Sequence, residues 1–284
     1  MSGVAIVTDT THYLPREFVE CFELSEVSLY VNWPDRQQRE SEMGSFDAFY
    51  ERLRAARDLP TTSQPSVGDF LAVYEPLLDA GRDIISIHLS GGISGTVEAA
   101  RQAAAQCPPG RVHVLDSTTA CGGLGLMAVA AAGGAREGIG IEACLARARE
   151  ARERLTLWFA IDTLEYLVRG GRIGKAQGMV GSALRIKPIL SVQSDIVPIE
   201  RVRTSGRAFD RLVEMFRTLK ADGVDGWVVQ HIQAPDVAAR LVDAGREIFG
   251  TDPVFVSEIG PVIGTHVGPG LIGGGGVPRS LLPL

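Results

Sequence analysis

The chain of 284 residues has only four cysteines and no long apolar run. The cysteines form no CxxC pair and stand near no histidines at metal-ligand spacing, which argues against a disulfide framework and a zinc site. No run approaches the roughly 20 apolar residues that cross a bilayer, and no N-terminal segment joins basic residues to a long apolar stretch. We therefore expect a soluble, cytoplasmic protein without stable membrane insertion or cofactor. The cysteines should be buried apolar residues: Cys21, Cys107, Cys121 and Cys144.

Nucleotide-binding signatures are also missing. Neither the GxxxxGK[ST] P-loop nor the glycine-rich loop of protein kinases occurs in the sequence. If this protein takes part in phosphoryl transfer, another protein must therefore supply the nucleotide chemistry.

The formal net charge of −6 disfavours general nucleic-acid binding, but the charge is unevenly distributed. Residues 166–207 contain eight basic and two acidic side chains, a formal charge of +6, which leaves −12 for the rest of the chain. Such a basic face predicts contact with a phosphate or an acidic partner. The alternative is a set of solvated arginines at turns and strand ends.

Two loops are rich in hydroxyls and small residues, 61–66 and 90–96, and each precedes an amphipathic helical pattern. The first turn of a helix leaves backbone N–H groups without partners and carries partial positive charge. Each loop is therefore a candidate site for a carboxylate or a phosphate. Ser66 and Asp69 form a capping-box pattern at the start of the first helix.

The hydrophobic content of 45% suffices for one large core or two modest ones, and we expect two domains, 1–154 and 155–284. In the first, strand patterns alternate with helical patterns, which predicts an open α/β sheet. Three polar segments, Thr8-Asp9, Ser90–Ser94 and Asp116-Ser117, should converge at the carboxyl ends of its strands.

The second half predicts an α+β domain in which strands are interrupted by polar helices. We expect its strands at 157–161, 187–192, 196–199, 226–231 and 254–256. The glycines of 260–270 should bracket a short strand. The run Gly273–Gly276 is expected to form a flexible tail.

Eight segments in order resemble the DegV family of bacterial acyl-binding proteins, which also supply the acyl carrier subunit of fatty-acid kinase. The matching segments are 6–10, 62–66, 89–96, 114–117, 166–173, 184–190, 202–204 and 264–270. The resemblance implies a two-domain DegV-like fold that holds a long-chain fatty acid, such as palmitate or oleate, in a tunnel between the domains. It implies a carrier that is not itself an enzyme and that presents the acid to a separate kinase subunit.

The resemblance also implies residue roles. Thr62 and Ser94 would hydrogen-bond the carboxylate. His266 matches the family motif and would lie near the head group, or alternatively would be a structural histidine in a tight turn. Arginines at Arg169 or Arg172, and at Arg203, would contact the kinase partner or the phosphate of an acyl phosphate.

Two alternatives from other classes stay open. Gly92–Thr96 nearly matches the G-x-S-x-G nucleophile elbow, so that a serine hydrolase would use Ser94 with Asp162 or Asp195 and with His266. Against it, Thr96 replaces the final glycine, and no second motif identifies an oxyanion loop. The other alternative is a regulator that binds a small anion without a long tunnel.

Overall fold

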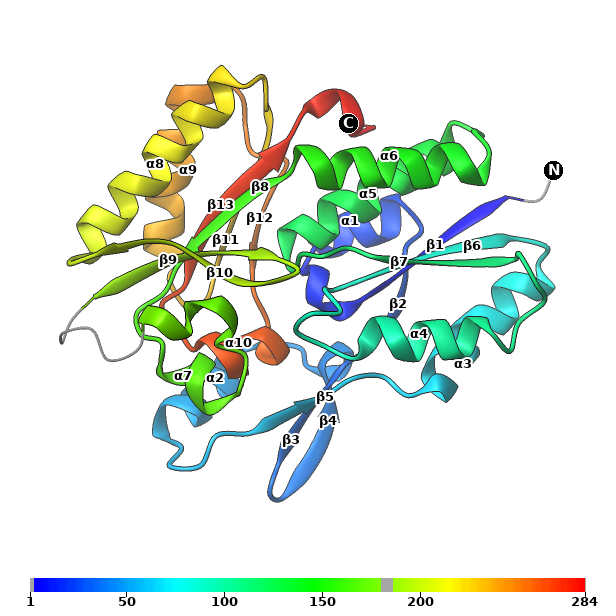
Figure 1. Ribbon diagram of the computed structural model, residues 1–284, viewed down its shortest axis with the longest axis horizontal. Helices are drawn as coiled ribbons and strands as arrows, with labels where there is room; N and C mark the ends of the chain where they lie inside the picture. Colours follow the sequence, from blue (N-terminus) through cyan, green and yellow to red (C-terminus); the bar gives the residue numbers. More distant parts are fainter. Residues whose placement is uncertain (1–2, 180–185, 284) are drawn as a thin grey trace.

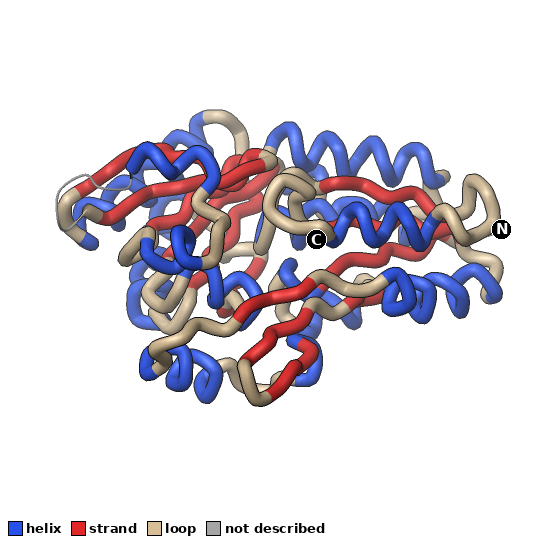
Figure 2. Tube along the Cα trace, turned by 60° about the horizontal axis from the view of Figure 1, so that its bottom comes forward, coloured by secondary structure: helices blue, strands red, loops and turns tan. Residues whose placement is uncertain are grey.

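The computed structural model describes residues 3–179 and 186–283. Its strands form a four-stranded sheet (β2-β1-β6-β7), a six-stranded sheet (β10-β9-β8-β13-β11-β12) and a three-stranded sheet (β4-β3-β5). Figure 1 shows the two larger sheets beside each other, each with helices on its outer face. The small sheet extends from the bottom of the molecule (Figure 2).

The strands are β1 (Val4–Asp9), β2 (Ser25–Val27), β3 (Tyr30–Trp33), β4 (Arg36–Arg39), β5 (Thr61–Ser63), β6 (Asp83–His88), β7 (Val112–Asp116), β8 (Thr156–Ala160), β9 (Lys187–Gln193), β10 (Asp195–Val202), β11 (Gly226–His231), β12 (Phe255–Glu258) and β13 (Ile272–Val277). The α-helices are α1 (Arg16–Cys21), α2 (Asp47–Ala55), α3 (Val67–Asp79), α4 (Thr96–Ala104), α5 (Gly122–Arg136), α6 (Ile141–Arg154), α7 (Glu165–Arg169), α8 (Ser205–Ala221), α9 (Pro235–Phe249) and α10 (Pro261–Val267). Short 3-10 helices are η1 (Thr10–His12), η2 (Glu40–Glu42), η3 (Gly174–Met179) and η4 (Arg279–Leu281).

The first lobe confirms the predicted open α/β sheet. Strands β1, β6 and β7 run parallel, and the apolar side chains of β6 are fully buried, as expected for a strand covered on both faces. The Ser66 hydroxyl and the Asp69 carboxylate form the predicted capping box at the start of α3. Helices α3 and α4 cover the outer face of this sheet (Figure 1).

Helix α5 lies between the two large sheets and contacts strands of both. Every residue from Gly122 to Gly134 is buried, which is the pattern of a helix enclosed on all sides. A single hydrophobic cluster runs through it, joining residues such as Ile85 of β6 to Val228 of β11. Because this cluster includes residues from both halves of the chain, it does not mark a boundary between domains. The domain boundary expected near residue 155 stays a prediction.

In the second lobe, α8 and α9 cover the outer face of the six-stranded sheet. Their apolar stripes pack on an aromatic group of Phe216, Trp227 and Phe249. The five strands predicted at 157–161, 187–192, 196–199, 226–231 and 254–256 are present, with shifts of a few residues at their ends.

The glycine run 273–276 is not a flexible tail, and that prediction was wrong. It forms most of β13, a buried strand that pairs with β8 on one side and β11 on the other. A Cβ atom on Gly274 would lie 2.6 Å from Cζ of Phe216, and one on Gly275 would overlap the carbonyl oxygen of Thr156. Close approach of neighbouring groups, rather than a turn, explains the glycines.

Three further expectations differ from the structure. The strand expected within 260–270 is helix α10, which begins with Pro261 at its first position, where proline is well tolerated. The segment expected to be a loop at 61–63 is strand β5, and the sheet that it joins was not predicted. Of the cysteines, only Cys121 and Cys144 are buried, whereas Cys21 is exposed and Cys107 is partly exposed.

We predict that Gly275→Ala destabilises the protein by about 2 kcal/mol or more, because the new methyl group meets backbone that cannot move aside. Urea unfolding measures the loss. Gly206→Ala is the matched control, since a Cβ there meets nothing within 4 Å and the residue lies in helix α8, where alanine is favoured. Equal stability of the two variants would contradict this account of β13.

Candidate functional site

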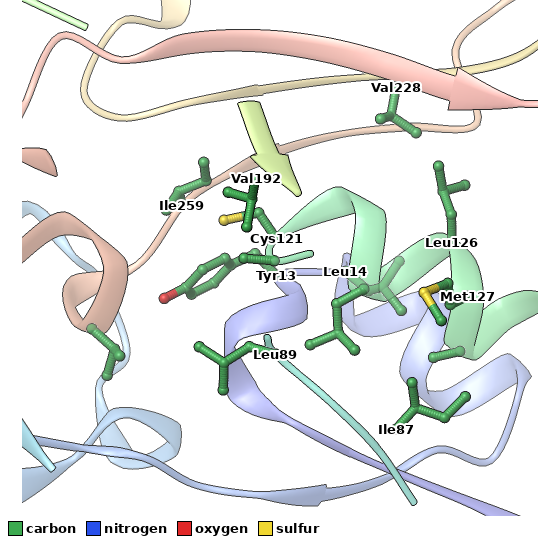
Figure 3. Packing of buried hydrophobic residues seen from close by; sticks show 14 of the residues in the cluster. Tyr13, Leu14, Ile87, Leu89, Cys121, Leu126, Met127, Val192, Val228 and Ile259 are labelled. Carbon is green, nitrogen blue, oxygen red and sulfur yellow. The ribbon is translucent and has the colours of Figure 1, made fainter. Parts of the chain in front are cut away.

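A cavity of about 370 Å³ lies between the two large sheets, at the end of α5. This volume is within the roughly 300–1,000 Å³ range of small-molecule sites. Most of its wall is apolar: Leu29, Leu89, Ile93, Ala120, Cys121, Leu157, Phe159, Leu167, Val192, Ile196, Ile259, Val262, Ile263, Val267 and Leu271. Figure 3 shows how Leu89, Cys121, Val192 and Ile259 approach one another from four separate segments of the chain.

The glycine strand contributes to this cavity directly. Gly273 lines it opposite Phe159, its partner in the β8–β13 register. A Cβ atom on Gly273 would lie 3.0 Å from Cβ of Phe159, so a larger residue here would crowd Phe159 on the cavity wall. This role is not evident from the sequence, in which the glycine run predicts a flexible tail.

Polar groups gather at the mouth of the cavity. Thr62, Ser94, Arg172 and His266 all line it, although they come from β5, the β6–α4 loop, the segment after α7, and α10. The structure thus brings together four of the six predicted site residues. Oγ1 of Thr62 and Nε2 of His266 lie 2.7 Å apart, in hydrogen-bonding contact.

His266 is neutral at physiological pH, because burial, helped by the positive charge of Arg172, lowers its pKa to about 4. Its Nδ1 is buried and has no hydrogen-bond partner among the described residues. A buried N–H without an acceptor is rarer than a buried acceptor without a donor, so we assign the ring proton to Nε2. Nε2–H then donates to Oγ1 of Thr62, and the Thr62 hydroxyl proton is free to point into the cavity.

Ser94 stands just before the first turn of α4. Its hydroxyl lies 2.8 Å from Oγ1 of Thr96, and it accepts a hydrogen bond from the Thr96 N–H. The first-turn N–H groups of α4 have no carbonyl acceptor within the helix, so this end carries partial positive charge. Ser94 therefore adds a hydroxyl to a site that already favours an anion.

Hydrogen bonds hold the loop that carries Ser94 against the second lobe. Oγ of Ser90 donates to the carbonyl oxygen of Ser194, at 2.5 Å, and the N–H of Ser194 donates to the carbonyl oxygen of Thr118, at 2.8 Å. The turn between β9 and β10 is thereby held against the carboxyl end of the first sheet.

A second, more polar cavity of about 440 Å³ adjoins the mouth and shares Thr62, Arg172 and His266 with the first. Arg169 lines only this second cavity and donates to the carbonyl oxygen of Arg57, at 2.8 Å. Of these two arginines, Arg172 lies beside both cavities, whereas Arg169 lies beside the second one alone.

The other basic residues do not all join this group. Arg203 is exposed just before α8 and lines neither of these two cavities. Lys187 pairs with Asp162 at 2.5 Å. Arg185 of the basic segment, with part of the matching segment 184–190, lies outside the described residues.

The three polar strand ends do meet, but two of them serve the fold. Asp9 is fully buried and accepts hydrogen bonds from the Leu89 N–H and from Thr11, and its carboxylate contacts His88. These bonds keep the pKa of Asp9 below its usual range against the raising effect of burial. Asp116 accepts from the Gly91 N–H and so shapes the loop that leads to Ser94.

The arrangement does not support a hydrolase at Ser94. Asp162 pairs with Lys187, Asp195 accepts from the N–H of Ile196, and neither contacts His266. A linked Asp9, His88 and Ser86 does occur, but all three are fully buried and Ser86 also bonds the Tyr74 hydroxyl. That chain is part of the core and has no access to a substrate.

A buried carboxyl group supports helix α10, which carries His266. Oε1 of Glu40 accepts hydrogen bonds from the Val262 N–H, at 2.8 Å, and from the Tyr13 hydroxyl, at 2.9 Å. Its Oε2 has no partner in the described part of the chain. Burial raises the pKa of Glu40 to about 7, although these donors act to lower it.

The described residues contain neither a metal centre nor a membrane-spanning helix. In the described ranges, His, Cys, Asp and Glu side chains form no group of three or more that could hold a metal ion. No described helix is both long and apolar enough to span a membrane. The fold and the cavity together define a two-lobed α/β protein with an apolar pocket that ends in a polar, anion-favouring mouth.

Comparisons with known proteins agree with this class. The family model described as "uncharacterised protein, DegV family" matches residues 3–278. A DegV domain-containing protein of Streptomyces coelicolor is 39% identical over 273 residues, covering 95% of this chain and 96% of the relative. The chain belongs to the DegV family.

Solved structures are similar over nearly the whole chain. A DegV family protein of Thermus thermophilus, described by its fatty acid binding, has a TM-score of 0.88 at 34% identity and covers 97% of this chain and 99% of its own. DegV of Bacillus subtilis, described as a fatty acid binding protein, has a TM-score of 0.88 at 33% identity, with the same coverage of both chains. The predicted two-domain DegV-like fold is therefore confirmed.

We predict that Glu40 makes the stability depend on pH. Because its folded-state pKa of about 7 lies above its ordinary value of 4.5, only the folded state holds this proton between those values. The free energy of unfolding should therefore fall by about 3 kcal/mol as the pH rises from about 4.5 to about 7. Glu40→Gln should remove this fall while keeping the acceptor for Val262.

Urea unfolding of both proteins between about pH 5 and about pH 8 measures this slope. Glu42→Gln is the control, because the side chain of Glu42 is 64% exposed and the variant should keep the wild-type slope. A slope in Glu40→Gln equal to that of the wild type would show that Glu40 is not the titrating group.

Proposed function

We propose that this protein binds a long-chain fatty acid in the cavity between its lobes, 1–154 and 155–284, with the carboxylate at Thr62 and Ser94. The observation that carries the proposal is the polarity of the cavity, whose wall is mostly apolar and whose few polar lining residues include the group of Thr62, Ser94, His266 and Arg172. A molecule with one anionic end and a long apolar body fits this division. The relatives from Thermus thermophilus and Bacillus subtilis, described as binding fatty acids, support it.

The energetics favour a long chain over a small anion. At about 0.8 kcal/mol per buried CH₂, the 14 methylenes of palmitate supply roughly 11 kcal/mol before the cost of association. A small anion would leave the apolar wall in contact with water. The hydroxyls and the start of α4 then fix the orientation of the head group, and Arg172 offsets its charge.

The second cavity is a candidate site for phosphorylation of the ligand's carboxylate. It adjoins the proposed carboxylate position and is lined by Arg169 and Arg172 as well as by Asp58, so it has room for a phosphate and two positive charges against one negative charge. We therefore also propose that the protein presents its fatty acid, such as palmitate or oleate, to a separate fatty-acid kinase. Arg203 and the basic segment would contact that partner.

We expect Thr62→Val and Ser94→Ala to weaken palmitate binding by about 10- to 100-fold each, because each removes one hydroxyl donor to a carboxylate. Isothermal titration of delipidated protein with palmitate measures the affinity. Thr62→Ser and Ser94→Thr are matched controls that keep the hydroxyl and should bind nearly as wild type. Unchanged affinity in both hydroxyl-free variants would overturn the assignment of the head-group site.

For presentation to a kinase, Arg203→Ala should leave palmitate affinity unchanged and slow acyl-phosphate formation by about tenfold, since an exposed charge acts mainly on association. The assay combines palmitate-loaded protein, ATP and the purified catalytic subunit of a fatty-acid kinase. Arg246→Ala is the control, because Arg246 is an exposed arginine on α9 outside the basic segment. Normal turnover of Arg203→Ala would remove Arg203 from the docking surface.

A further inference from the structure

The sheet of the second lobe opens beside the cavity. Strands β8 and β9 pair through Phe159 with Leu190 and through Ala160 with Ile189, and the ladder between them does not extend to Leu157. A small cavity of about 240 Å³ lies where they separate. It is lined by Arg152, Leu155, Thr156, Leu157, Trp158, Ser191, Val192 and Gln193.

This outer cavity and the apolar cavity share three lining residues: Leu157, Trp158 and Val192. Side chains alternate along a strand, so Leu157 lies on the same face of β8 as Phe159, toward the apolar cavity. Trp158 lies on the opposite face and packs with the α8 cluster. The partition between the two cavities therefore consists of the Leu157 and Val192 side chains, which are 9% and 8% exposed.

The start of β8, which carries Leu157, lies away from β5 and α10, which carry Thr62 and His266 (Figure 1). In Figure 1, β5 and α10 lie at the lower edge of the region between the lobes, whereas the start of β8 follows directly from α6 at its upper edge. Figure 3 shows Val192 reaching down from the second lobe beside Cys121. A ligand whose carboxylate is at Thr62 would thus direct its other end toward Leu157.

The outer cavity differs in character from the inner one. Thr156, Ser191 and Gln193 contribute polar groups, and Arg152, whose guanidinium donates to Oγ1 of Thr118 at 2.7 Å, lies beside them. The methyl end of an alkyl chain would gain little free energy by entering the outer cavity, because the polar groups there would lose their contact with water.

We propose that Leu157 and Val192 form the stop that ends the acyl cavity and sets the upper limit of ligand chain length, with the outer cavity as the space behind it. This inference rests on the proposed function, since it assumes a fatty acid oriented with its carboxylate at the mouth. Truncating either side chain joins the two cavities and admits longer chains.

The test uses full-length, delipidated protein incubated with an equimolar mixture of saturated fatty acids from laurate to behenate. Native mass spectrometry, followed by solvent extraction, gives the distribution of bound chain lengths. For Leu157→Ala the distribution should move upward by about three carbons, because three side-chain carbons are removed. Each added methylene that is buried should raise affinity about fourfold, so the preference for the longest chains should change strongly.

Val192→Ala is a second variant, which keeps the test decisive if Leu157→Ala fails to fold by circular dichroism. Leu155→Ala is the matched control, because Leu155 lines only the outer cavity and should leave the distribution unchanged. If wild type binds fatty acid but both partition variants keep its distribution, the stop is overturned while the proposed function stands. If wild type binds no member of the mixture, the proposed function itself fails.

Discussion

The close packing of β13 is the constraint on which the rest of the structure depends. This strand lies between β8 and β11, so it holds the second sheet together, and it can do so only because Gly274 and Gly275 leave room for Phe216 and for the backbone of β8. Gly273, which also has no side chain, forms part of the wall of the apolar cavity. A strand of ordinary β-formers here would both crowd the sheet and fill the site.

An apolar cavity needs its few polar groups satisfied in the absence of ligand, because unpaired polar groups in such surroundings are costly. The mouth meets most of this requirement by pairing its groups with one another, Thr62 with His266 and Ser94 with Thr96, and leaves Nδ1 of His266 without a partner among the described residues. With His266 neutral, these pairs leave hydroxyl protons able to turn toward an incoming oxygen. Arg172, at the junction of the two cavities, is then the formal positive charge beside the proposed carboxylate.

Local sequence patterns correctly predicted those helices and strands in which the residues' own preferences match the observed structure. The apolar runs of β1 and β6 and the Ser66–Asp69 capping box are examples. Prediction failed where tertiary contacts outweigh local preference, as in β13, and where strands are short and polar, as in β4 with Arg36–Arg39. The residues of the mouth could be named from the sequence because they lie in segments that resemble motifs of the DegV family. The cavity wall could not, because it is built from single residues scattered along the chain, and no local pattern distinguishes them from ordinary core residues.

The length of the cavity depends on how the lobes are held together, because its mouth is built on β5, α4 and α10 and its far wall on β8 and β9. Three of the polar contacts between the lobes illustrate how that relation is set. Tyr50 of α2 donates to the carbonyl oxygen of Ile259 at 2.6 Å, Gln230 of β11 accepts from the Gly122 N–H at 2.5 Å, and Ser90 bonds Ser194. Each is directional and involves a buried or partly buried group, so a small shift between lobes would leave several donors without acceptors. The positions of mouth and stop are thereby fixed relative to each other, which is what a cavity needs in order to distinguish one chain length from the next.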